Sequence, residues 1–137
     1  MAHIGQILMT IGILQFGVMP LFADLNRSHA TNPHWPAHAR FHIVTQVLTS
    51  SGVAAAALYF LWSGRVEPRL GACIAALLSA VAIGAFFISA ALARRYGGQV
   101  TAGTGVGAVR VAMIDGNVIN FGSAAVIILL GRLLIAA

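Results

Sequence analysis

The chain has 137 residues, of which 59% are hydrophobic and only 8% are charged. A soluble domain carries about a quarter charged residues, so this composition excludes both a soluble globular domain and a disordered chain. The eight basic residues are all arginine and lie at or near the ends of apolar runs, without a basic patch, so the net charge of +5 does not predict a nucleic-acid partner.

Four apolar segments are long enough to cross a membrane, which takes about 20 residues. They run from about residue 4 to 22, 36 to 62, 70 to 93 and 111 to 134. We therefore predict an all-α fold, an integral-membrane four-helix bundle that forms one domain over residues 1–137. We expect a multi-pass protein of the inner (cytoplasmic) membrane.

Small residues are frequent within these spans, as in the run Ala54–Ala57. Helices in lipid associate largely through close packing, which small side chains permit. The sequence therefore predicts a tight bundle that extends into a homo-oligomer in contact with the lipid bilayer.

Histidine is concentrated in one short stretch: four of the five lie within fourteen residues, at His29, His34, His38 and His42. A helix that begins at Pro36 would place His38 and His42 on one face, one turn apart. In a four-span bundle, the connector before this helix and the start of the fourth span lie at the same end. Topology therefore predicts one polar cluster there, with these members: Asp24, His38, Arg40, His42, Asp115, Asn117 and Asn120.

Ionisable groups within a membrane are costly and commonly mark a functional site. We expect the His42 ring to face the bundle, because it follows Phe41 and precedes two more apolar residues, and lipid is a poor environment for imidazole. His38 is equally consistent with a functional role and with contact to headgroups. His29 and His34 are expected in a solvated loop.

The other polar residues each have a structural alternative. Arg40 could extend its guanidinium to the headgroups, and Asp115 could cap or interrupt the fourth helix. Asn117, Asn120 and Gln15 could join helices by hydrogen bonds.

The chemistry open to this cluster is narrow, because the sequence has no phosphate-binding loop, nucleophile triad or paired carboxylates. Imidazole could ligate haem iron or act as a general acid or base. A metal held by His38 and His42 would need a third ligand, for which Asp115 and His34 are the candidates.

Short motifs spread over much of the chain resemble the styrene oxide isomerase family. They are Met1-Ala-His3, Ile7-Leu-Met9, Phe16-Gly-Val18, Trp35, Ala39-Arg-Phe-His42, Leu70-Gly71 and Phe86-Phe87. The resemblance implies a four-span trimer that binds haem b through His42 and isomerises epoxides to carbonyl compounds. The run Asn32-Pro-His-Trp-Pro-Ala-His-Ala-Arg-Phe-His42 also resembles an uncharacterised family of small membrane proteins.

Two positions depart from the isomerase pattern. The catalytic asparagine of that family would fall on Leu48, and its catalytic tyrosine has no match, since Phe86 and Phe87 occupy that neighbourhood. Asn117 or Asn120, with Asp115, would then have to position the substrate.

Three functional hypotheses follow. The first is a membrane enzyme for a small lipophilic substrate that enters from lipid, a haem-dependent epoxide isomerase with His42 as the iron ligand and with His38, Arg40, Asp115, Asn117 and Asn120 around the substrate. The second is a cofactor-free or metal-assisted isomerase or cyclase, in which His38, His42 and Asp115 move protons. The third is a non-catalytic membrane subunit or a carrier of lipophilic molecules.

Overall fold

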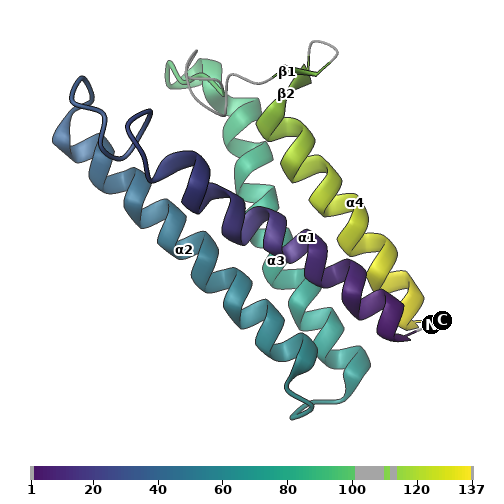
Figure 1. Ribbon diagram of the computed structural model, residues 1–137. Coiled ribbons are helices and arrows are strands. Elements are labelled where there is room, and N and C mark those ends of the chain that lie inside the picture. Colours follow the sequence, from purple (N-terminus) through teal and green to yellow (C-terminus); the bar gives the residue numbers. More distant parts are fainter. Residues whose placement is uncertain (1, 101–109, 112–113, 137) are drawn as a thin grey trace.

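The computed structural model describes residues 2–100, 110–111 and 114–136, which form an antiparallel bundle of four helices (Figure 1). The helices are α1 (Ala2–Asp24), α2 (Ala37–Trp62), α3 (Pro68–Leu92) and α4 (Gly116–Ala136). All four are long and apolar enough to cross a membrane. The prediction of an all-α four-helix bundle is confirmed, and the chain is a multi-pass membrane protein.

Capping groups explain where the helices begin. α2 begins at Ala37, one residue later than predicted, with Pro36 directly before it. α3 begins two residues earlier than predicted, because the Glu67 carboxylate accepts hydrogen bonds from the backbone N–H groups of Arg69 and Leu70. Both hydrogen bonds lower the pKa of the Glu67 carboxyl below its ordinary value, and the one from the Arg69 N–H has the larger effect.

The fourth helix begins five residues later than predicted. The two-residue strands β1 (Arg110–Val111) and β2 (Ile114–Asp115) pair antiparallel before it. Asp115 Oδ1 then accepts a hydrogen bond from the Asn117 backbone N–H at 2.8 Å, the interaction of a helix N-cap. A short 3-10 turn, Ala93–Arg95, follows α3.

The most extensive helix contact joins α1 and α4, and glycines make it possible. A Cβ on Gly5 would lie 2.5 Å from the Gly131 carbonyl oxygen, and a Cβ on Gly131 would lie 2.5 Å from the Gly5 carbonyl oxygen. About two turns farther along α1, a Cβ on Gly12 would lie 2.9 Å from the carbonyl oxygen of Ala124. The two backbones are therefore in contact where lipid offers little other force for association.

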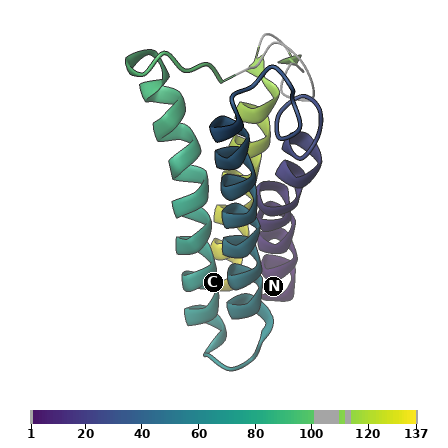
Figure 2. The ribbon, with the colours of Figure 1, turned by 90° about the vertical axis from the view of Figure 1, so that its left-hand side faces the viewer.

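The remaining helices complete a ring in which α2 packs between α1 and α3. Met9, Ile13 and Phe16 of α1 are fully buried at its centre. Figure 2 shows the C-terminal half of α3 diverging from α2 toward the end of the bundle that carries the α1–α2 loop. The two chain ends lie together at the opposite end (Figure 1).

Gly131→Ala is expected to destabilise the bundle by about 1–3 kcal/mol, the usual cost of overpacking. The added methyl group would meet the backbone of both Gly5 and Met9. Equilibrium unfolding in mixed micelles measures the effect. Gly84→Ala is the matched control, since nothing lies within 4 Å of a Cβ there; equal stability of the two variants would contradict this account of the α1–α4 contact.

Candidate functional site

A cavity of about 940 Å³ lies at the end of the bundle where α3 diverges. Residues of all four helices line it, together with the loop between α1 and α2. Its polar side chains include Asp24, His29, Gln46, Asn117 and Asn120, and its apolar wall includes Met19, Ile43, Val53, Val81, Phe86 and Phe121. This size and mixture are typical of a site for a small lipophilic molecule with one polar group.

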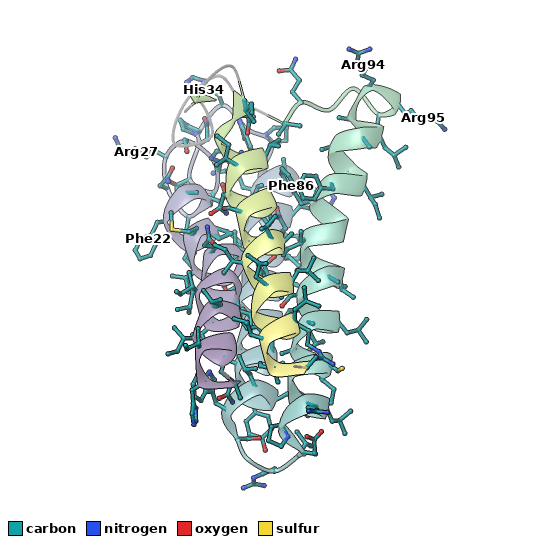
Figure 3. All side chains as sticks on the ribbon, turned by 90° about the vertical axis from the view of Figure 1, so that its right-hand side faces the viewer. Phe22, Arg27, His34, Phe86, Arg94 and Arg95 are labelled. Atoms are coloured by element: carbon teal, nitrogen blue, oxygen red, sulfur yellow. The ribbon has the colours of Figure 1, made fainter. Side chains whose placement is uncertain are left out.

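The cavity opens between α2 and α3. Gln46 and Thr49 of α2 and Ala85 and Ser89 of α3 line the cavity and are also exposed. The inner wall is formed by Phe86 of α3, which is labelled in Figure 3. Its ring stacks on that of Phe121 of α4, with centroids 4.2 Å apart.

Asp24 and His29 are the acidic and the basic side chain of the cavity. His29 Nδ1 lies 3.8 Å from Asp24 Oδ1, and the side chains are only 14% and 23% exposed, respectively. The loop turns back sharply here, since the Ala30 N–H donates to the Asp24 carbonyl oxygen. The Trp35 and His29 rings form a T-shaped pair, with centroids 5.1 Å apart.

A short hydrogen-bond chain fixes the tautomer of neutral His29. The Asn26 amide nitrogen donates to the carbonyl oxygens of Phe22 and Ala23, so Asn26 Oδ1 must be the atom that accepts from Ser28. Ser28 Oγ donates its one proton to that oxygen, at 2.6 Å. The 2.7 Å contact between Ser28 Oγ and His29 Nδ1 therefore has Nδ1–H as the donor. The lone pair of neutral His29 is thus on Nε2.

The two asparagines of α4, Asn117 and Asn120, line the same cavity. Asn120 Nδ2 donates to the Gln15 carbonyl oxygen at 3.5 Å, and Gln15 Nε2 donates to Ser123 Oγ at 3.1 Å. Asn120 and Gln15 therefore join α1 to α4, as their structural alternative predicts. Asn117 and Asn120 also line the cavity, as their functional reading requires.

His38 and His42 lie outside the cavity, and the expectation that His42 faces the bundle is wrong. Both residues are exposed, and their Nε2 atoms are 2.9 Å apart. His42 precedes the fully buried Val47 by five residues, which places it about 140° around the helix from that side chain. With 26 residues, α2 is about 39 Å long and exceeds the hydrocarbon thickness of about 30 Å, so its first turns can extend to the headgroups and lipid need not force the imidazole inward.

The other predicted members of the cluster lie near the same end but do not line the cavity. Arg40 is half-buried, and its Nε is buried with no hydrogen-bond partner in the described part of the chain. Asp115 caps α4. His34 is exposed, while His29, expected in solvent, is the histidine that reaches the cavity. Periodicity gave no signal for His29, since it lies in a loop.

The residues of a single chain do not fit a haem held by His42. An axial imidazole must face an apolar slot, whereas His42 faces outward and its Nε2 contacts His38. Among the described residues, no group of three His, Cys, Asp or Glu side chains could hold a metal ion. Asp115 and His34 therefore do not supply the third ligand that a metal site at His38 and His42 was predicted to need.

The chain belongs to a family of unknown function, DUF6640, whose model matches residues 8–134. No curated protein and no solved structure matches the chain.

The hydrogen-bond chain predicts that neutral His29 carries its proton on Nδ1. Long-range ¹H–¹⁵N correlation spectra of histidine-labelled protein in micelles distinguish the two tautomers. Ser28→Ala removes the acceptor and is expected to shift His29 toward the Nε2–H form, while the exposed His34 serves as an internal reference. A predominantly Nε2–H ring in the unaltered protein would contradict the assignment.

Proposed function

We propose that this protein is an integral-membrane isomerase that rearranges a small lipophilic molecule by proton transfer, with His29 as the general base and acid and Asp24 as its partner. The observation that carries the proposal is the Asp24–His29 pair, 3.8 Å apart and largely buried in the wall of a mostly apolar cavity. Ionisable groups in such surroundings commonly mark catalytic sites.

The cavity supports a substrate with an apolar body and one oxygen function. Its aliphatic and aromatic wall suits the body, and its opening between α2 and α3 allows entry from the bilayer. The amides of Asn117 and Asn120 can hydrogen-bond a carbonyl, hydroxyl or epoxide oxygen. The polar end of the substrate would then lie beside Asp24 and His29.

In the proposed reaction, His29 Nε2 removes a proton from carbon and returns it at another atom of the same molecule. Substrate and product have the same composition, so the reaction needs no oxidant and no co-substrate. The Asp24 carboxylate stabilises the imidazolium formed between the two steps, because opposite charges attract strongly where water is scarce. Ser28 Oγ holds Nδ1–H and so keeps Nε2 as the reacting atom.

This reaction is the cofactor-free form of the His/Asp hypothesis, with Asp24 and His29 in place of Asp115, His38 and His42. Haem-dependent epoxide isomerisation remains the alternative, and it would need a second chain to cover His42. The proposal includes a homo-oligomer in the cytoplasmic membrane as the setting. A carrier of lipophilic molecules would use the same cavity for binding alone.

His29→Gln is expected to lower the isomerisation rate by about 10²–10⁴-fold, the usual contribution of a general base. Asp24→Asn is expected to lower it less, since it leaves the base in place. Purified protein in micelles would be given styrene oxide, limonene oxide and a β,γ-unsaturated steroid ketone, with products identified by gas chromatography and mass spectrometry. His42→Gln is the matched control and should retain the rate.

Three outcomes would overturn the proposal. Full activity of the His29→Gln variant would show that His29 is not the general base. A Soret band that is lost in His42→Ala, together with the activity, would establish the haem-dependent alternative. Saturable binding of these probes without conversion of any of them would favour the carrier.

A further inference from the structure

We propose that His38 and His42 form a two-nitrogen site for a divalent transition-metal ion, and that Cu²⁺ binds there most tightly. The pair lies outside the cavity, so the inference does not depend on the proposed isomerase activity. It rests on the distance between two imidazole nitrogens and on the position of the pair in α2.

The separation of the nitrogens is that of two adjacent ligands on one metal. His38 Nε2 and His42 Nε2 are 2.9 Å apart. Imidazole nitrogens bind first-row metals at about 2.0–2.1 Å, so two of them at a right angle are about 2.9 Å apart, whereas a tetrahedral arrangement needs about 3.3–3.4 Å. A right angle is the geometry of square-planar Cu²⁺ and of octahedral ions.

The Phe41 ring contacts both imidazoles. It is nearly parallel to the His38 ring, with planes 11° and centroids 6.5 Å apart, and lies in a T-shaped arrangement with His42, with centroids 5.8 Å apart. The four-residue spacing on a regular helix fixes the two Cβ positions. Little conformational freedom would be lost on chelation, which favours binding.

Water can complete the coordination shell. α2 has 26 residues and is about 39 Å long, against a hydrocarbon thickness of about 30 Å. His38 is the second residue of α2 and so lies at the level of the headgroups, with His42 one turn deeper. Both side chains are exposed, so an ion on Nε2 keeps open positions for solvent.

The tautomers available to the two rings are also compatible with metal binding. In the metal-free pair, one Nε2–H donates to the lone pair of the other Nε2. Chelation needs both Nε2 lone pairs, so each neutral ring must carry its proton on Nδ1. One ring changes tautomer, and no proton is lost from the neutral pair. Any imidazolium present releases its proton first, as is general for metal ligands.

The test is Cu²⁺ binding to the full-length chain without a histidine tag, in micelles. In a His3→Gln background, which removes a histidine near the chain terminus at the other end of the bundle, we expect one Cu²⁺ per chain. Its electron paramagnetic resonance spectrum should show two equivalent imidazole nitrogens. Ni²⁺ should bind more weakly than Cu²⁺, in the usual order of affinities.

The matched variant is His42→Gln with Thr45→His, which keeps the number of histidines and places them two turns apart. Losing even an outer partner of a metal ligand costs roughly 10–100-fold in affinity, so the loss of one nitrogen of the chelate should weaken Cu²⁺ binding by more than about tenfold. Circular dichroism establishes that the variant is folded.

Two results would overturn the site. One is equal Cu²⁺ affinity in the matched variant. The other is a spectrum of the His3→Gln protein that shows a single imidazole nitrogen or no bound ion. Because the spectrum of the His3→Gln protein can overturn the site by itself, and His42→Gln alone should leave one imidazole nitrogen on the ion, failure of the matched variant to fold would not prevent a conclusion.

Discussion

The close contact between α1 and α4 determines how the rest of the bundle is arranged. Gly5, Gly12 and Gly131 let the two backbones touch, and no other pair of helices packs as extensively. Because the helices are antiparallel, this contact holds the end of α1, with Asp24, beside the start of α4, with Asn117. On the far side, α3 reaches α4 at this end through the larger Phe86 and Phe121 rings. The close glycine contact between α1 and α4 and the larger aromatic rings between α3 and α4 together leave the space for the cavity.

Polar side chains within the spans form hydrogen bonds between helices, because unsatisfied polar groups are expensive in hydrocarbon. Pro20 lacks an N–H and interrupts the backbone hydrogen bonds of α1. Close to it, Ser51 Oγ of α2 donates to the Gly17 carbonyl oxygen at 2.7 Å. Gln15 uses its amide nitrogen to reach α4, while its Oε1 is buried with no partner in the described ranges. These groups fix the register of α1 against two neighbours.

The sequence predicts the spans well and the site only in part, for physical reasons. Hydropathy over 20 residues depends little on detail, so the four helices and the antiparallel order follow from it. Topology also places Asp24, Asn117 and Asn120 at one end correctly. Hydropathy does not reveal which face of α2 packs against the bundle, because small and apolar residues occur all around this helix. The argument from the cost of imidazole in lipid therefore fails for His42. His29 depends on a loop closed by Asn26 and Ser28, which has no periodicity to reveal it.

The two kinds of histidine environment suggest why the chain carries so many of these residues near one end. His29 is enclosed, and Ser28 fixes its tautomer, so it can offer one defined lone pair to a molecule in the cavity. His38 and His42 are exposed and pair with each other, so either ring can carry the shared proton. A fixed tautomer suits stereospecific proton transfer, whereas an adaptable pair suits chelation. The cavity opens between α2 and α3, while the pair lies nearer the headgroups, so a lipophilic molecule and an aqueous ion would approach this end of the protein by separate routes.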